Sequence, residues 1–236
     1  AQALWEAEMP APRRKALGFA VGRELLPALL AGAGAEVLAT DLDMEDDRAR
    51  VWNKTGQHAS AADALFHPHL VPRADFDARV RLRAVDMNHI PGDLRDGGFD
   101  CLWSVCSLEH LGSLQAGMDF VVAAMDCLRP GGIAVHTTEF NIDPEGPTIE
   151  AGATVLYQRR HLDALGDRLA AAGHMMAPVD YAPGDGVLDR FIDLPPYMDA
   201  QGGHPVPDAP HLRLSFGEHV VTSVGFIVKA RGAAGG

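Results

Sequence analysis

The chain has 236 residues, a mass of 25.2 kDa and a formal charge of −12, with 32 Asp and Glu against 20 Lys and Arg. An apolar fraction of 47% and a charged fraction of 22% are ordinary for globular proteins, which excludes extensive disorder and fibrous repeats. A pI near 5.2 disfavours nucleic acid or an anionic membrane as the main partner, because a negative surface repels polyanions. The sequence does not determine the oligomeric state.

The cysteines and the absence of long apolar runs predict a cytoplasmic protein. Cys101, Cys106 and Cys127 are odd in number and lack CxxC spacing, so we expect reduced thiols. No run approaches the ~20 apolar residues that a membrane span needs. No charged segment followed by an apolar one opens the chain in the manner of an export signal.

Strands alternate with helices through the first 138 residues. We expect strands at 15–20, 36–40, 80–85, 99–105 and 133–138, and helices at 24–33, 44–65 and 114–128. The later part is expected to form a loop at 139–152, a helix at 159–172, a Pro- and Gly-rich stretch at 195–210 and a β-rich run at 219–228. The alternation predicts an α/β, Rossmann-like, doubly wound sheet that is mostly parallel and binds ligands at the carboxyl ends of its strands.

We expect a single domain over residues 1–236. Its core would comprise residues 15–141, and residues 142–230 would supply a lid or substrate region and the C-terminal strands. A long loop inside a compact domain is either such a wall or a surface excursion, and the sequence leaves both interpretations open.

Residues suited to a nucleoside follow the first two strands. Gly18, Ala20 and Gly22 form a turn with little side chain, which lets a ligand approach the backbone. Asp41 ends the second strand, where a carboxylate can accept hydrogen bonds from ribose hydroxyls. A dinucleotide site would require GxGxxG, but Ala20 and Arg23 occupy the second and third glycine positions. The turn therefore disfavours a nicotinamide cofactor.

The third and fourth strands end on further candidates. Asp86 would accept a hydrogen bond from the exocyclic amine of adenine, with Met87 packing on the ring. Ser104 and Cys106 would close the floor after the fourth strand. Each signal alone is common in α/β folds, but their order along the chain favours an adenine nucleoside.

Four ordered runs resemble the motifs of class I S-adenosylmethionine-dependent methyltransferases. They are LGFAVGRELLPALLAGAGAEVLATDLD (17–43), VDMNHIP (85–91), FDCLWSVCSLEHLG (99–112) and LRPGGIAVHTTEFN (128–141). The small "type 11" group is the most similar, and the GRE, SLEHLG and HTTEFN pieces resemble a bacterial subgroup associated with surface-polysaccharide genes. The resemblance implies a seven-stranded sheet whose last strand, 219–228, is antiparallel.

The resemblance also implies a binding site for the methyl donor. The implied contacts come from Gly18, Gly22, Asp41, Asp86 and Met87, to which we add the neighbouring candidates Phe19, Glu24, Leu42, Ser104 and Cys106. The family's acidic residue two places before the first glycine is Ala16 here. We therefore expect another group, with Glu24 the candidate, to bind the methionine amino group.

A second constellation is expected near the transferred methyl group. Glu109 and His110 follow the fourth strand, and His136 and Glu139 end the fifth, so both pairs would face one crevice. Methyl transfer to an alcohol benefits from a base that removes the hydroxyl proton, and histidine suits that role near neutral pH. We predict His110 as the base, with His136 second and Glu109 assisting. A structural alternative for His110 is a hydrogen bond to a buried carbonyl.

A divalent metal is an open alternative. Small-RNA terminal methyltransferases and some ubiquinone-pathway O-methyltransferases show a Glu-x-x-Glu-His pattern that binds such an ion, but Cys106 stands at the first glutamate here. The remaining candidate ligands are Glu109, His110, Glu139, His204, His211 and His219. A mixed set without fixed spacing is weak support, so we assign no metal ligand.

The sequence thus predicts a methyltransferase that uses S-adenosylmethionine to methylate an oxygen of a sugar, in a glycan or a glycan precursor. A small-molecule or glycan acceptor is the expected partner. Two alternatives stay open. One is a non-catalytic, methyltransferase-like binding module of a larger enzyme, suggested by Ala16 and by a first residue other than methionine. The other is an NAD(P)-dependent oxidoreductase.

Overall fold

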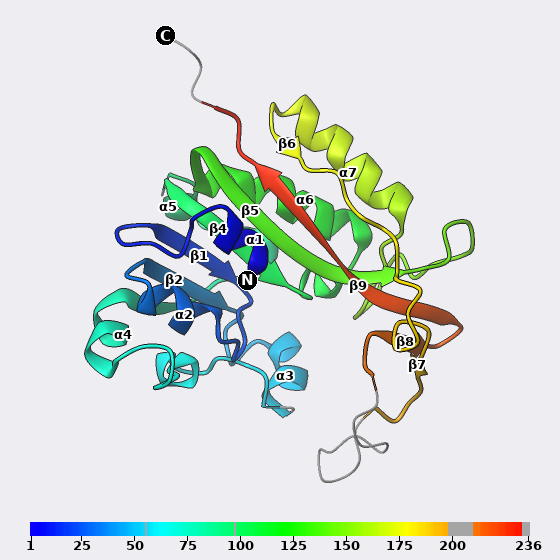
Figure 1. Cartoon of the computed structure of the whole chain (residues 1–236), viewed down its shortest axis with the longest axis horizontal. Helices are drawn as coiled ribbons and strands as arrows, with labels where there is room; N and C mark the ends of the chain where they lie inside the picture. The colour runs from blue at the N-terminus through cyan, green and yellow to red at the C-terminus, as the bar shows by residue number, and fades with distance from the viewer. Residues whose placement is uncertain (55, 97, 198–209, 233–236) are drawn as a thin grey trace.

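The computed structural model describes residues 1–54, 56–96, 98–197 and 210–232 and contains one large sheet (Figure 1). Its strands follow the order β3-β2-β1-β4-β5-β9-β8-β7, with β6 paired to β9 beside this path. The strands are β1 (Lys15–Phe19), β2 (Glu36–Asp41), β3 (Val80–Ala84), β4 (Phe99–Val105), β5 (Leu128–Asn141), β6 (Met175–Met176), β7 (Ile192–Asp193), β8 (Arg213–Phe216) and β9 (His219–Lys229).

The sheet is parallel from β3 to β5 and antiparallel where β9 joins β5. This arrangement confirms the expected doubly wound α/β sheet with an antiparallel last strand. The described part has nine strands rather than seven, because the short strands β6, β7 and β8 add to β9 in the C-terminal third. The carboxyl ends of β1 to β5 lie at one edge, where a ligand site is expected.

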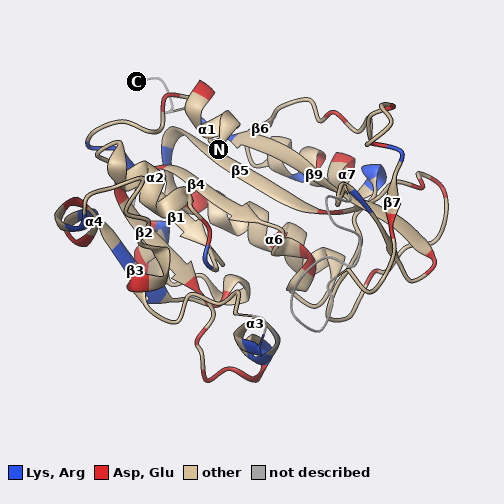
Figure 2. Ribbon diagram, turned by 60° about the horizontal axis from the view of Figure 1, so that its bottom comes forward, with Lys and Arg blue, Asp and Glu red and all other residues tan. Residues whose placement is uncertain are grey.

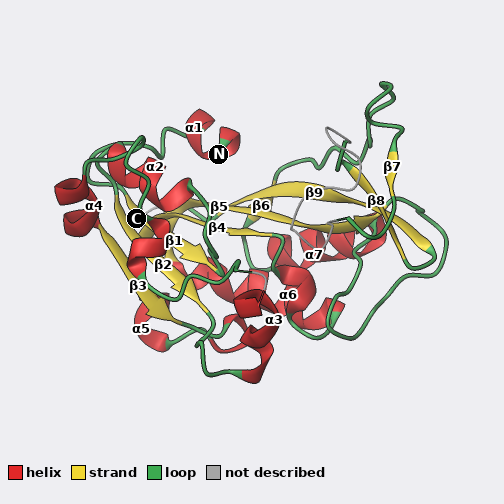
Figure 3. Ribbon diagram, turned by 90° about the horizontal axis from the view of Figure 1, so that it is seen from below, coloured by secondary structure: helices red, strands yellow, loops and turns green. Residues whose placement is uncertain are grey.

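Helices cover both faces of the sheet (Figure 3). The helices are α1 (Gln2–Glu6), α2 (Leu26–Gly32), α3 (Arg50–Lys54), α4 (Arg73–Arg79), α5 (Gly92–Arg95), α6 (Leu114–Ala124) and α7 (Arg159–Ala171). Buried apolar side chains of α1, α2 and α4 form one cluster with the sheet, and those of α5, α6 and α7 form a second on the opposite face. Burial on both faces explains why the strands read as almost continuous apolar runs.

The segment expected to be helical at 44–65 is broken instead. It contains the 3-10 turn η1 (Asp47–Ala49), the short helix α3 and the turn η2 (Ala62–Leu65). The side chain of Asp46 caps η1 by accepting from the backbone N–H of Arg48, and α3 follows η1 directly. This segment lies beside the sheet edge that carries the candidate site (Figure 1).

Three other boundaries differ from expectation. Helix α4 lies between the expected elements 44–65 and 80–85, in a stretch where no helix is expected. Helix α6 ends at Ala124, and the 3-10 turn η5 (Met125–Cys127) completes the expected segment. Strand β5 begins at Leu128 and continues to Asn141, because all of 133–141 pairs with β9 and the ladder satisfies its backbone groups.

Charged side chains concentrate away from the central strands. The ribbon of Figure 2 is coloured for charged residues along β3, α4, α7 and the loop around α3, while β5 and β9 carry few. Cys101 and Cys127 are buried free thiols and Cys106 is partly buried. Within the described ranges, no helix combines the length and apolar character needed to cross a bilayer.

Candidate functional site

A cavity of about 280 Å³ opens at the carboxyl ends of β1 to β4. Its lining comes from the turns after these strands and from the segment that follows β2. The lining residues are Ala20, Val21, Gly22, Arg23, Glu24, Asp41, Leu42, Arg48, Trp52, Gln57, His58, Val85, Asp86, Met87, Val105, Cys106, Ser107, His110 and Leu111. The cavity approaches the roughly 300–1,000 Å³ of small-molecule sites and lies where open α/β sheets bind ligands.

The turn after β1 is held in an unusual backbone conformation. Gly22 has a φ of +52° and Ala20 a φ of +47°, so both lie in the left-handed region that glycine adopts without strain. A Cβ on Gly22 would lie 2.8 Å from the carbonyl oxygen of Gln57. Gly22 therefore permits the close approach between the first turn and the segment after β2.

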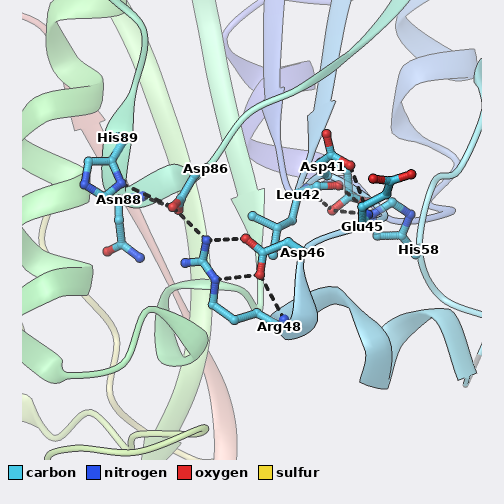
Figure 4. Close-up of polar contacts among 10 residues, drawn as sticks. Asp41, Leu42, Glu45, Asp46, Arg48, His58, Asp86, Asn88 and His89 are labelled. Atoms are coloured by element: carbon cyan, nitrogen blue, oxygen red, sulfur yellow. Dashed lines mark hydrogen bonds and ion pairs between the residues drawn. The ribbon is translucent and has the colours of Figure 1, made fainter.

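Asp41 joins these two parts of the site. Its carboxylate accepts backbone N–H groups from Gly22 at 3.2 Å, Ala59 at 3.1 Å and Leu42 at 2.9 Å. His58 donates from Nε2 to the carbonyl of Leu42 at 2.7 Å, beside the same carboxylate (Figure 4). An ionised carboxylate has about four acceptor positions, so three backbone bonds leave one for a ligand hydroxyl.

Asp86 and Met87 occupy the tip of β3 as the sequence predicts. Met87 is 6% exposed and Asp86 caps the 3-10 turn η3 (Met87–His89) by accepting from Asn88. Asp86 also receives a hydrogen bond from Arg48 at 2.9 Å (Figure 4). Burial opposes its ionisation, but these hydrogen bonds outweigh burial and lower the pKa of Asp86 below its usual value.

Glu24 contributes a desolvated carboxyl group to the cavity wall. The indole N–H of Trp103 donates to its Oε1 at 2.5 Å. The indole lies under the first turn because Gly18 has no Cβ, which would otherwise meet the ring at 2.4 Å. Burial raises the pKa of Glu24 to about 7, and the hydrogen bond from Trp103 only partly opposes this rise. A cationic ligand group would favour its ionised form.

His110 lines the same cavity, at the end of the 3-10 turn η4 (Leu108–His110). Its Nδ1 lies 2.9 Å from the carbonyl oxygen of Ala153, and because a carbonyl only accepts, Nδ1 carries the proton. In the neutral ring Nε2 then holds the lone pair that a base requires. Trp52 packs edge-on against the ring, with centroids 5.2 Å apart. The expected carbonyl contact and a basic nitrogen thus coexist in one residue.

Five predicted site residues do not line the cavity: Glu109, which lies just behind it, and four others. Ser104 and His136 are each 0% exposed, with Ser104 Oγ and His136 Nδ1 2.7 Å apart in the core. Burial lowers the pKa of His136 to about 3, so this ring stays neutral and cannot reach the cavity as a base. Phe19 packs against Phe120 in the core. Gly18, like the other three, does not line the cavity and acts through its contact with Trp103.

Glu109 lies just behind the cavity rather than in its wall. It is 0% exposed, and its Oε2 accepts from Thr138 Oγ1 at 2.9 Å. Side-chain ligand atoms of Cys106, Glu109 and Glu139 lie within 4.8 Å of one another. Burial raises the pKa of all three groups, to about 7 for both glutamates.

This acidic cluster does not by itself require a metal. Two carboxyl groups that titrate near pH 7 are partly protonated there and can hydrogen bond without a cation. Of the other candidate ligands, His211 lies 2.6 Å from Asp193, His219 lies 3.4 Å from Asn141, and His204 falls outside the described residues. We therefore assign no metal ligand here.

The sequence did not indicate several lining residues from the segment after β2. They are Arg48, Trp52, Gln57 and His58. Arg48 stands beside acidic residues, a pattern typical of a solvated surface ion pair. Trp52 stands in a polar stretch, and its spacing indicates no ligand. Their positions follow from the contacts of Asp41 and Asp86 with this segment, which no local pattern encodes.

Comparison with known proteins identifies the family. A family model described as a methyltransferase domain matches residues 17–136, about half of the chain, from β1 into β5. The chain belongs to this methyltransferase domain family. The match contains the glycine turn, the three carboxyl groups of the cavity and His110. No curated protein matches the chain.

Solved structures share the methyltransferase fold at low identity. The N1-methyltransferase of 1,6-didemethyltoxoflavin from Burkholderia thailandensis, solved with that compound and S-adenosylhomocysteine, is 16% identical, with a TM-score of 0.50 over 97% of this chain and 76% of that one. The glycopeptide N-methyltransferase MtfA is 13% identical, with a TM-score of 0.52 over 96% and 92%.

The [4+2]-cyclase SpnF is also similar, at 19% identity and a TM-score of 0.51 over 72% of this chain. The match spans 55% of the length of SpnF. At these identities the likeness concerns the fold alone, and a cyclase among the similar structures shows that the fold does not fix the reaction.

Proposed function

We propose that the chain is an S-adenosylmethionine-dependent methyltransferase that methylates a sugar hydroxyl, in a glycan or a glycan precursor. The cavity at the ends of β1 to β4 carries the proposal, because it gathers a glycine turn, three carboxyl groups and His110, all within the residues of the family match. The methyltransferases in the comparison include one solved with S-adenosylhomocysteine.

The donor's nucleoside would lie across the tips of β2 and β3. The acceptor position left on Asp41 suits a ribose hydroxyl, and Asp86 suits the exocyclic amine of adenine. Met87 supplies an apolar surface for the ring. Leu42 extends the lining beside Asp41.

The donor's methionine part would lie near Glu24. Because Ala16 cannot bind an amino group through its side chain, a carboxylate elsewhere must compensate for the donor's positive charge. Glu24 lines the cavity, and the indole of Trp103 holds its Oε1. The ammonium or sulfonium charge of the donor would stabilise the ionised carboxylate, which burial disfavours.

His110 would act as the general base. As the acceptor oxygen attacks the donor methyl carbon, the carbon–sulfur bond breaks and S-adenosylhomocysteine leaves as a neutral thioether. The hydroxyl proton passes to Nε2 of His110, whose other nitrogen is held by the carbonyl of Ala153. Alignment of the acceptor with the donor supplies the remaining acceleration.

The acceptor class rests on the subgroup resemblance and on hydrogen-bonding groups beside Cys106. The hydroxyls of Thr137 and Ser223 each lie 3.5 Å from the Cys106 thiol, and Glu139 lies in the same cluster. Such hydroxyl and carboxyl groups suit a polyhydroxylated acceptor. An alcohol also gains more from a base than a neutral amine does, because the amine attacks through its free lone pair whereas the alcohol is a weak nucleophile until its proton is removed.

A methyl-transfer assay tests the proposal. The protein is incubated with S-adenosylmethionine labelled in the methyl group and with panels of sugar hydroxyl, amine and thiol acceptors. Label in an alkali-stable ether on a sugar is expected, with a large loss of product for His110→Ala. Transfer only to amines or thiols would contradict the sugar assignment, and absence of transfer despite donor binding would favour a non-catalytic module.

A further inference from the structure

Arg48 connects two acidic side chains from different parts of the chain. Its guanidinium donates from Nε to Asp46 Oδ1 at 3.0 Å and from Nη2 to Asp46 Oδ2 at 2.6 Å. The same Nη2 donates to Asp86 Oδ2 at 2.9 Å (Figure 4). The residue belongs to η1, in the segment after β2, and Asp86 lies 38 positions later at the tip of β3. Arg48 therefore joins the two strand ends that flank the cavity.

This contact divides the two oxygens of Asp86 between different roles. Oδ2 accepts from Arg48 and lies 3.2 Å from His89 Nδ1. These two contacts use both acceptor positions of Oδ2. Oδ1 accepts from the backbone N–H of Asn88 at 2.9 Å and keeps one position. The carboxylate is thus held at Oδ2, and its remaining acceptor position is on Oδ1. Asp86 lines the cavity.

The same contact fixes the orientation of the Asp86 carboxylate. Asp46 holds the planar guanidinium at two atoms, which presents Nη2 to Asp86 in a fixed direction. An ionised carboxylate only accepts hydrogen bonds, so it binds an amine and repels a carbonyl oxygen. A carboxylate that is free to rotate presents its remaining acceptor position less well to an amine and so discriminates less between an amine and a carbonyl oxygen.

We propose that Arg48 is a positioning residue that makes the site selective for a 6-aminopurine over a 6-oxopurine. The inference rests on the proposed function, in which Asp86 receives the exocyclic amine of adenine. Arg48 acts through the carboxylate of Asp86. Arg48 also lines the cavity. If its role were merely structural, replacing it would weaken the binding of both purines equally.

Arg50 offers a matched control. It lies two positions later and pairs with Asp47 at the surface, where the two side chains are 70% and 77% exposed. Its removal deletes an arginine from the same segment without touching Asp86. Arg48→Lys is a second variant, because it restores one positive charge without the planar fork that Asp46 holds.

The experiment is a calorimetric titration with S-adenosylhomocysteine and with S-inosylhomocysteine, which has a 6-oxo group and an N1–H where the adenosyl compound has a 6-amino group and an unprotonated N1. The unaltered protein should prefer the adenosyl ligand. Arg48→Ala should reduce that preference roughly tenfold, the value of one charge-assisted hydrogen bond. Arg48→Lys should keep part of the preference, and Arg50→Ala all of it.

Two results would overturn the inference. An unchanged ratio of the two affinities in both Arg48 variants would reduce Arg48 to a structural role. Equal binding of both ligands by the unaltered protein would remove the selectivity itself. Failure of the folded, unaltered protein to bind S-adenosylhomocysteine would reject the proposed function, and the inference with it. Thermal unfolding of each variant establishes that it is folded.

Discussion

Trp103 donates its indole N–H to Glu24 at 2.5 Å, and this bond links the centre of the sheet to the wall of the cavity. The indole can lie beneath the turn after β1 because residue 18 is glycine. A buried side chain of β4 thereby orients a carboxylate near the helix that follows β1. This arrangement places an acidic group in the cavity wall, where we propose that the methionine part of the donor binds.

Donor affinity should depend on pH through Glu24. Burial raises its pKa to about 7, and a cationic donor favours the ionised form, so binding releases a proton below that pH. Affinity for S-adenosylmethionine should therefore rise between about pH 6 and pH 8. Titration calorimetry in buffers of different ionisation enthalpy measures both the affinity and the proton release.

Two variants separate the contribution of Glu24 from other groups. Glu24→Gln should weaken binding and remove the pH dependence. Trp103→Phe should move the midpoint upward, because the indole hydrogen bond lowers the pKa of Glu24. The same pH dependence in Glu24→Gln as in the unaltered protein would exclude Glu24 as its source.

His110 and His136 should differ in what their replacement affects. His110→Ala should lower kcat by roughly 100-fold or more while donor affinity is retained, because a general base acts on the acceptor proton. His136→Gln should lower the melting temperature instead, since the ring is buried against Phe120 and Phe226. Steady-state kinetics with the acceptor found in the transfer assay, and thermal unfolding, provide the two measurements. Normal turnover by His110→Ala would refute the base assignment.

The fold could be predicted from the sequence to a large extent because strands and strand ends have local signals. Apolar runs closed by Asp41 and by Asp86 marked the tips of β2 and β3, and Gly22 marked the first turn. These residues line the cavity as expected. Their identification needed only the rule that parallel strands bind ligands at their carboxyl ends.

The wrong assignments of Ser104 and His136 have one cause. The two residues are register partners on β4 and β5, so they share a face of the sheet. That face packs on α6 and α7, whereas Thr137 and Glu139 point to the opposite side. Because both faces of a parallel sheet are buried, no apolar alternation reveals which residue faces the site.

Gly22→Ala should abolish donor binding, while the free energy of unfolding should fall only modestly. The left-handed φ costs an alanine about 1–2 kcal/mol, and the added Cβ would also push against the carbonyl of Gln57 at 2.8 Å. Gly56→Ala is the matched control, because Gly56 has a φ of +69° and no atom within 4 Å of its added Cβ. Calorimetry measures the donor affinity of both variants, and thermal unfolding measures their stability. Gly56→Ala introduces backbone strain alone, whereas Gly22→Ala adds the clash with Gln57. Equal donor affinities in the two variants would mean that the Gln57 contact does not shape the site.

The stability of the ligand-free protein should depend on pH through Glu109. Its pKa is raised from 4.5 to about 7 by burial, so between these values the folded chain holds a proton that the unfolded chain has lost. This group therefore makes the protein less stable as the pH rises from about 4.5 to about 7. Glu109→Gln should flatten that part of the curve in urea unfolding. If the free energy of unfolding of the variant depends on pH as steeply as that of the unaltered protein, groups other than Glu109 cause the pH dependence.

The most direct test of the central claim is a calorimetric titration of the purified protein with S-adenosylmethionine, S-adenosylhomocysteine and NADH. The account predicts stoichiometric binding of the two adenosyl ligands, weakened in Glu24→Gln, and no binding of NADH. Binding of NADH alone, or of no ligand by a folded protein, would contradict the assignment of the cavity as a methyl-donor site.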